Sequence, residues 1–257
     1  MKFYKYEGAG NDFIIIDDRS NSFPEKDFGL IKHLCDRHFG IGADGLMLLQ
    51  LAEGYDFKMV YYNSDGNYSS MCGNGGRCIT QFAHSLGVIQ KNCHFLAVDG
   101  PHHAVVQADG LISLQMIDVD FIEVVDDNAL LLDTGSPHYV KRVKGLDTLN
   151  LIEESRKIRY NDRFKSEGVN VNFVEERNGS LFIRTYERGV EDETLACGTG
   201  VTAAAVAMAY WGNHNKTIEI KAVGGDLEVR LEKVKDSFQD IWKTGPATFV
   251  FKGEIEG

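Results

Sequence analysis

The sequence predicts an α+β fold made of two similar halves, and three observations lead to this prediction. Strand-like and helical segments follow one another along most of the 257 residues, and the strands are more numerous. A Cys-Gly-x-Gly loop begins at Cys72 and again at Cys197, each time ahead of a helical segment. The two cysteines lie 125 residues apart, and the same offset aligns the segments around them. We therefore expect an internal duplication, with two halves that face each other across a cleft.

In the first half, short runs of apolar residues predict strands, and apolar residues spaced three to four positions apart predict helices. The expected strands are 13–17, 46–51, 57–62 and 94–98, followed by a hairpin of 103–107 and 111–116 around Asp109-Gly110. The expected helices cover 27–39, after Pro24, and the stretch from near Cys72 to Gly87.

After about residue 117 the same order of segments returns. The expected strands are 138–143, 171–176, 181–187, 218–223, 227–234 and 247–256, with turns at Asn178-Gly179 and Gly224-Gly225. The expected helices are 147–158, with Asp147 as N-cap, and about 198–211, ending at Gly212. The same offset pairs Asn11 with Ser136, Gly45 with Asn170, and Asn63 with Arg188. So many matches at one offset favour duplication over chance.

Composition and charge exclude several classes of protein. The net charge is −11, and no basic patch typical of nucleic-acid binding is present. The chain opens MKFYKYEGAG, without the apolar core of a secretion signal, and no apolar run approaches the length of a membrane span. We expect a cytoplasmic protein. An odd number of cysteines, five, and the lack of any C-x-x-C pair argue against a disulfide framework and a zinc site.

The two loops have the chemistry needed to invert a carbon atom. Glycines let a ligand approach the backbone, and the first N–H groups of a helix attract a carboxylate and lower the pKa of a nearby thiol. If the halves face each other, Cys72 and Cys197 flank one small site. One thiolate would remove the α-proton of a bound amino acid, and the other thiol would return a proton to the opposite face.

Each cysteine alone would more often be structural, and only the symmetric pair favours catalysis. Cys35, Cys78 and Cys93 are interpreted as core or bystander residues. The segment 40–45 matches G-x-G-x-x-G, but it follows a helix and enters a strand, which is the reverse of a dinucleotide-binding context. No lysine stands out as a pyridoxal phosphate site.

Seven motifs along the chain together resemble the diaminopimelate epimerase family. They are GAGNDFIIID (8–17), GIGADGL (40–46), YYNSDG (61–66), MCGNGGRC (71–78), TGSPHYV (134–140), EGVNVNFV (167–174) and YERGVEDETLACGTG (186–200). They span almost the whole length, and the combination of CGNGGRC with ERG and ETLACGTG is highly specific.

The resemblance implies two pseudo-symmetric domains, each a curved mixed or antiparallel sheet wrapped around a central helix. They would be 1–117 with 249–257, because the last strand crosses back, and 118–248. The family interconverts LL- and meso-diaminopimelate, for lysine and peptidoglycan precursor synthesis, without pyridoxal phosphate, metal or other cofactor. The resemblance suggests a homodimer. The only other partner it implies is the small-molecule substrate. We expect neither a nucleic acid nor a membrane as a partner.

The resemblance also implies the roles of individual residues. Cys72 would be the base for the LL isomer and Cys197 the base for the meso isomer. Backbone N–H groups of Gly73, Asn74, Gly198 and Thr199 would bind the reacting carboxylate. The residues that would hold the substrate, chiefly its distal amino-acid end, are Asn11, Asn63, Asn170, Glu187 and Arg188. By their chemistry, Arg188 can fork onto a carboxylate and Glu187 can bind an ammonium.

The sequence departs from the family pattern in three places. Ser136 stands where members often have Asn, Gly45 where some have Gln, and the loop at 190–193 is one residue longer. His138 could assist a cysteine or be an ordinary core or surface histidine. Three alternatives stay open: another amino-acid racemase of the same fold, a thiol-redox protein, and an amino-acid binding module without catalysis.

Overall fold

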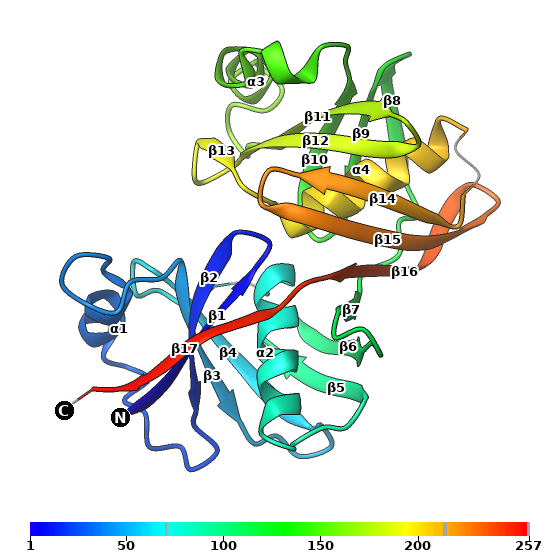
Figure 1. The fold of residues 1–257 in the computed structure, drawn as a ribbon. Helices are drawn as coiled ribbons and strands as arrows, with labels where there is room; N and C mark the ends of the chain where they lie inside the picture. Colours follow the sequence, from blue (N-terminus) through cyan, green and yellow to red (C-terminus); the bar gives the residue numbers. More distant parts are fainter. Residues whose placement is uncertain (70, 213–214, 256–257) are drawn as a thin grey trace. The chain divides into compact units, whose positions relative to one another are not determined.

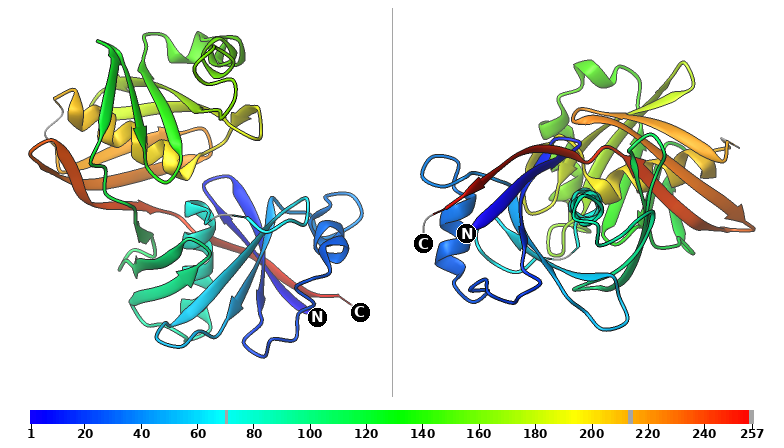
Figure 2. Two further views of the ribbon diagram at one scale, coloured as in Figure 1. Left: turned by 180° about the vertical axis from the view of Figure 1, so that it is seen from behind. Right: turned by 60° about the horizontal axis from the view of Figure 1, so that its bottom comes forward.

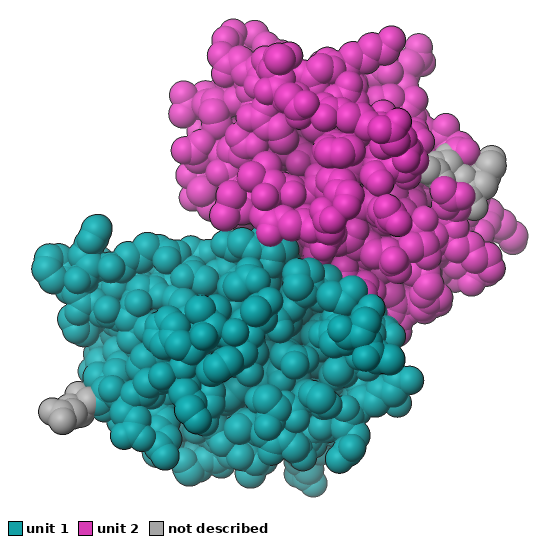
Figure 3. All heavy atoms as spheres, in the orientation of Figure 1, with its two compact units in different colours: residues 1–114, 245–257 teal, residues 115–244 magenta. Residues whose placement is uncertain are grey.

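The computed structural model describes residues 1–69, 71–212 and 215–255, and the chain forms two compact units (Figure 3). Unit 1 is Met1–Leu114 with Gly245–Gly257, and unit 2 is Gln115–Thr244. The division expected from the sequence, 1–117 with 249–257 and 118–248, differs from these units by a few residues at each boundary. It stays a prediction as a division into independently folding domains.

Unit 1 is built on one mixed sheet with the strand order β17-β1-β2-β3-β4-β5-β6-β7. The pairs β2–β3 and β4–β5 are parallel and the other pairs are antiparallel. The strands are β1 (Lys2–Gly8), β2 (Asn11–Asp17), β3 (Gly45–Gln50), β4 (Phe57–Asn63), β5 (Asn92–Ala97), β6 (Gly100–Val106), β7 (Ile112–Gln115) and β17 (Thr248–Glu254).

Unit 2 repeats this arrangement with the strand order β8-β9-β10-β11-β12-β14-β15-β16. Here β10–β11 and β12–β14 are the parallel pairs, and short β13 adds to β12. The strands are β8 (Ile122–Asp126), β9 (Ala129–Asp133), β10 (Pro137–Arg142), β11 (Asn170–Arg177), β12 (Ser180–Glu187), β13 (Asp192–Thr194), β14 (Thr217–Ala222), β15 (Gly225–Val234) and β16 (Ser237–Gly245).

Each unit curves its sheet around one long buried helix, α2 (Gly73–Ser85) in unit 1 and α4 (Gly198–Tyr210) in unit 2 (Figure 1). The right-hand view of Figure 2 looks along α2 and shows strands of unit 1 around it. In α4 every residue from Gly200 to Ala209 is buried, as a helix that is apolar on all sides requires. The α+β fold expected from the sequence, with two similar curved sheets around central helices, is confirmed.

The internal repeat is visible in both the elements and their pairing. Helices α2 and α4 start and end at positions that differ by 125 residues, and so do β5 and β14. The parallel pair β2–β3 places Phe13 opposite Gly45, and β10–β11 places His138 opposite Asn170, which are equivalent positions at that offset. The repeat therefore includes strand register and not only the order of elements.

Two predicted helices differ from those in the structure. Helix α1 (Phe28–Cys35) begins after the N-cap Asp27 but ends before residue 39, because Asp36 turns the backbone to an extended conformation. The expected helix 147–158 is a 3-10 turn (Leu146–Thr148) followed by α3 (Leu151–Arg159). Asn150 caps α3, so the expected N-cap Asp147 was wrong. Strands β1, β8, β9, β13 and β16 were not anticipated, and residue 256 of the last expected strand lies outside the described residues.

None of the helices in the described ranges combines the length and apolar character needed to cross a membrane.

An ion-pair network with one buried member, Lys5, and one exposed member, Arg37, ties β1, β2 and the loop before β3 together. The Nζ of Lys5, a buried residue, lies 2.8 Å from Asp12 Oδ2, and Arg37 Nη2 lies 2.7 Å from Asp12 Oδ1 and 2.8 Å from Asp44 Oδ1. Burial alone would raise the pKa of Asp12. Hydrogen bonds from Arg37 and Lys5, with their charges, outweigh burial and hold it at about 2.

Acid is therefore expected to weaken unit 1 through Asp12. A lowered pKa means that the stabilisation is present above pH 4 and is lost as pH falls toward 2. After allowance for solvent screening, we expect Asp12→Asn to cost about 1–2 kcal/mol near neutral pH. Urea unfolding near pH 6 and near pH 3 should show this difference shrinking in acid. The exposed Asp162→Asn variant is the control, and equal losses for both variants would contradict the prediction.

Candidate active site

The first half-site is the start of α2. Cys72 is the N-cap residue, in an extended conformation, and its side chain makes no capping hydrogen bond. The first helical bond runs from the Gly76 N–H to the Cys72 carbonyl, at 2.7 Å. The N–H groups before Gly76 have no carbonyl acceptor within the helix. They therefore give this end of the helix its partial positive charge. The Cys72 side chain is partly exposed.

Three side-chain hydrogen bonds fix the loop that carries Cys72. Asn74 Nδ2 donates to Asn11 Oδ1 at 2.8 Å, and Asn11 Nδ2 donates to Asp44 Oδ2 at 2.9 Å. Arg77, which is fully buried, donates from Nη1 to Asn74 Oδ1 at 3.0 Å. Because a guanidinium only donates, the Asn74 oxygen faces Arg77 and its NH₂ group faces Asn11. Asn11 and Asn74 are therefore brought together as predicted site residues.

Asn63 lies at the exposed end of β4, directly opposite Gly45 on β3. At Gly45 a Cβ atom would lie 2.4 Å from the Tyr62 carbonyl oxygen and 2.5 Å from the Tyr61 ring. The space that a longer residue would need at position 45 is thus occupied by neighbouring backbone and by Tyr61.

Gly45→Gln is expected to destabilise this chain by about 1–3 kcal/mol, because the overlap with a backbone carbonyl cannot be relieved by a side-chain rotation. Thermal unfolding of Gly45→Gln and Gly45→Ala measures the loss, and both should fall. Gly29→Ala is the control for glycine replacement, since a Cβ there would meet only Asp27 Oδ1, at 3.4 Å, an ordinary contact distance. A parental melting temperature for Gly45→Gln would contradict the prediction.

The second half-site is the start of α4. Cys197 is its N-cap residue and is 8% exposed. Its Sγ lies 3.5 Å from Thr199 Oγ1. Burial, and next the charge of Glu187, raise the pKa of the Cys197 thiol to about 12, although Thr199, the Gly200 N–H and Lys243 act against this. The lowered pKa expected for a thiol at a helix start is therefore wrong for Cys197, because burial outweighs the helix N–H groups and keeps the thiol protonated at neutral pH.

His138 lies beneath this loop and is fully buried. Its Nε2 lies 2.9 Å from Thr199 Oγ1, and its Nδ1 lies 3.0 Å from Asn172 Nδ2. Burial, assisted by the charge of Arg188, lowers the pKa of His138 to about 3, so the ring is neutral. His138 is therefore a core histidine and not a surface one. The Thr199 hydroxyl lies between its ring and the Cys197 sulfur.

The remaining predicted residues of unit 2 lie around β11 and β12. Asn170 Oδ1 accepts from the Arg188 N–H at 2.9 Å, and Asn170 Nδ2 donates to Ser136 Oγ at 2.9 Å. Arg188 Nη1 donates to the Glu167 carbonyl at 2.9 Å. Glu187 Oε2 accepts from Thr194 Oγ1 at 3.0 Å. Ser136 therefore bonds Asn170, even though it is shorter than the Asn often found at this position.

Several residues of these half-sites were not identified from the sequence. They are Asp44, Arg77, Thr134, Asn172 and Thr185. Asp44, Arg77, Thr134 and Asn172 lie inside recognised motifs, which was the available signal, but nothing in local spacing shows what they contact. Thr134, for example, donates to the Thr199 carbonyl at 2.8 Å.

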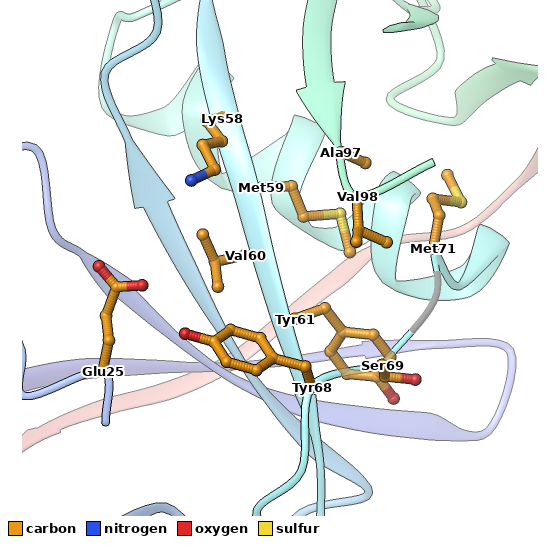
Figure 4. Close-up of a pocket in the computed structure, with 10 residues that line it drawn as sticks. All are labelled: Glu25, Lys58, Met59, Val60, Tyr61, Tyr68, Ser69, Met71, Ala97 and Val98. Atoms are coloured by element: carbon orange, nitrogen blue, oxygen red, sulfur yellow. The ribbon is translucent and has the colours of Figure 1, made fainter. Parts of the chain in front are cut away.

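A pocket of about 290 Å³ in unit 1 lies beside the Cys72 loop (Figure 4). Its lining includes the apolar and aromatic side chains of Met59, Tyr61, Tyr68 and Met71 and the charged side chains of Lys58 and Glu25. None of the lining residues is a predicted site residue. Within the described ranges, no cluster of three or more His, Cys, Asp or Glu side chains is arranged to hold a metal ion.

Two repeated curved sheets, each with a Cys-Gly-x-Gly loop at the start of its central helix, are the arrangement expected of an amino-acid epimerase, which is an isomerase, and the comparisons with known proteins agree with this class. The family model for diaminopimelate epimerase matches residues 3–124 and 130–250. A diaminopimelate epimerase of Flavobacterium psychrophilum is 51% identical, over 99% of this chain and 100% of that protein. A diaminopimelate epimerase of Chlorobaculum tepidum is 41% identical, over 96% of this chain and 98% of that protein. The chain belongs to the diaminopimelate epimerase family.

A crystal structure of a phenazine biosynthesis protein of the PhzF family from Bacillus anthracis has the same fold. Its TM-score is 0.72 at 17% sequence identity, and the match covers 100% of this chain and 99% of that one. At this identity the likeness concerns the fold alone.

Proposed function

We propose that this protein interconverts LL- and meso-diaminopimelate by passing the α-proton between Cys72 and Cys197, with no cofactor. One observation carries the two-cysteine proposal. Each cysteine is the N-cap of the central helix of its unit, at equivalent positions of the repeat. Each thiol therefore lies beside first-turn N–H groups that suit a carboxylate, which is the arrangement that two-sided proton transfer needs.

The reaction balances without any added oxidant or reductant. The Cys72 thiolate takes the α-proton of the LL isomer, and the electron pair left on carbon spreads onto the carboxylate, where N–H donors stabilise it. The Cys197 thiol then donates its proton to the opposite face and becomes the thiolate. The pKa of Cys197, about 12, supports this role, because the residue holds a proton at neutral pH. In the reverse direction the two roles exchange.

The proposed binding residues divide by chemistry. Backbone N–H groups of Gly73, Asn74, Gly198 and Thr199 hold the carboxylate at the reacting end. The distal amino-acid end is bound by side chains that can pair with a carboxylate or an ammonium, namely Asn11, Asn63, Asn170, Glu187 and Arg188. Access of both sulfurs to one α-carbon is part of this proposal.

Solvent isotope exchange tests the function. The protein, free of metal and pyridoxal phosphate, is incubated with LL-diaminopimelate in heavy water. Deuterium is expected at one α-carbon of each meso molecule as it forms, because the returning proton comes from a thiol that exchanges with solvent. Meso product without α-deuterium would contradict proton transfer through the cysteines, and absence of any meso product would contradict the substrate.

We further propose a cytoplasmic homodimer. Phe249, Val250 and Phe251 on β17 are 48%, 52% and 44% exposed, an apolar run that a second copy of the chain would cover. Sedimentation of the protein and of Phe249→Lys is the test. If Phe249→Lys sediments as a dimer like the unsubstituted protein, this strand is excluded as the interface. If the unsubstituted protein sediments as a monomer, the dimer itself is excluded.

A further inference from the structure

A chain of hydrogen bonds runs beneath the Cys197 loop from β11 to α4. It begins at Asn172, passes through His138 and Thr199, and ends at Cys197, with successive distances of 3.0, 2.9 and 3.5 Å. The side chains of Asn172 and His138 are fully buried. The proposed function uses the backbone of Thr199, and it gives no role to Asn172.

The contacts of Asn172 fix which way its amide group points. Its Nδ2 lies 3.3 Å from the Tyr139 carbonyl oxygen, which can only accept, so this end must be the NH₂ group. Its Oδ1 lies 2.9 Å from Thr185 Oγ1, which donates to it. Gly200 leaves room for this oxygen, because a Cβ there would lie 2.5 Å from it.

The amide in turn fixes the tautomer of His138. Because the NH₂ group of Asn172 donates to Nδ1, that ring nitrogen carries no proton. The proton of the neutral ring is therefore on Nε2, which donates to Thr199 Oγ1. A hydroxyl that accepts from the histidine still has its own proton to donate, and the Cys197 sulfur lies within its reach.

We propose that Asn172 is a positioning residue that acts through His138 to direct the hydroxyl proton of Thr199 at the Cys197 sulfur. That hydrogen bond stabilises the thiolate that forms when Cys197 gives up its proton. Glu187 and Lys243 are the charged groups that also act on this sulfur, with opposite effects. The proposal rests on the proposed function only for the use that catalysis makes of the thiolate.

Nuclear magnetic resonance tests the tautomer directly. In protein labelled with ¹⁵N-histidine, long-range proton–nitrogen correlations show which ring nitrogen carries the proton, and His138→Gln assigns the signals. We expect Nε2–H for His138 from about pH 6 to about pH 9. In Asn172→Leu the preference should be lost and both tautomers should appear. A parent protein with the proton on Nδ1 would overturn the proposal.

Alkylation of Cys197 tests the consequence for the thiol. Iodoacetamide modification is followed by mass spectrometry of the Cys197 peptide, as a function of pH, in a Cys72→Ala background. Thr199→Val and Asn172→Leu are expected to react about tenfold more slowly near neutral pH, equivalent to a rise of about one unit in the thiol pKa. Thr199→Ser keeps the hydroxyl and should react at the parental rate.

Thr202→Val is the matched control, because Thr202 is a buried threonine of the same helix whose hydroxyl donates to the Gly198 carbonyl and takes no part in the chain. A parental alkylation rate for Thr199→Val would overturn the proposal, even if Asn172→Leu failed to fold. The outcome is separable from the proposed function. If the unsubstituted protein does not epimerise diaminopimelate, the proposed function is wrong. The tautomer of His138 and the alkylation rate of Cys197 test the hydrogen-bond chain whether or not the protein has that activity.

Discussion

Replacing Cys72 with alanine is expected to lower the rate of LL- to meso-diaminopimelate conversion about a thousandfold or more, since no other base is proposed on that face of the α-carbon. Cys197→Ala should also stop inversion, but with a different isotope result. In heavy water this variant is expected to exchange the α-hydrogen of the LL isomer with retention, because Cys72 can still take the proton and return a deuteron to the same face.

Cys93→Ala is the control for loss of a thiol, because Cys93 is buried in the core and belongs to neither half-site. It should keep most of the parental rate. If Cys72→Ala or Cys197→Ala kept more than about a tenth of that rate, two-sided proton transfer would be untenable.

Gly200→Ala is expected to be the most damaging small substitution near the chemistry. Its Cβ would lie 2.5 Å from Asn172 Oδ1 and 3.2 Å from Cys197 Cβ, in a region held by buried hydrogen bonds. Such overpacking should cost about 1–3 kcal/mol of stability. Displacement of Asn172 and Cys197 should reduce epimerisation by about a hundredfold, the lower end of what positioned proton transfer contributes.

The repeat supplies a matched comparison at Gly75, the equivalent position in α2. A Cβ there would lie 3.1 Å from Met47 Sδ and 3.5 Å from the terminal methyl of Met59, both ends of flexible side chains. Alanine also favours a helix by about 1 kcal/mol over glycine, so Gly75→Ala should remain within about 1 kcal/mol of the parent in urea unfolding. Equal losses in Gly75→Ala and Gly200→Ala would show that the surroundings of Gly200 are not the cause.

Local signals predicted the two central helices within a few residues. Cysteine-glycine loops mark where they start, and Gly87 and Gly212 follow where they end, both with positive φ. The cap of α3 was misassigned although Asn150 is followed three residues later by Glu153, which it bonds at 3.0 Å. Strand β16 escaped because Asp240, with φ of 48°, interrupts the alternation that indicates a strand.

The half-sites depended on information that local patterns do not contain. Asn11 and Asn74 are neighbours only because β2 and α2 pack together, and a spacing of 63 residues says nothing of that contact. His138 and Asn172 meet because β10 and β11 pair in parallel, with His138 opposite Asn170. The resemblance to the family pointed to Asn11, Asn74 and Asn170 as site residues, but it gave no role to Asn172.

The crossing of the C-terminal segment back to unit 1 determines when that unit can be completed during synthesis. Strand β17 pairs with β1, and the buried Arg77 donates from Nε to the Pro246 carbonyl at 3.2 Å. Both of these partners, Pro246 and β17, are translated only after all of Gln115–Thr244. The unit whose translation begins first is therefore completed only after the other unit, and a chain released before β17 would leave the Nε of Arg77 without its acceptor and the sheet without that strand.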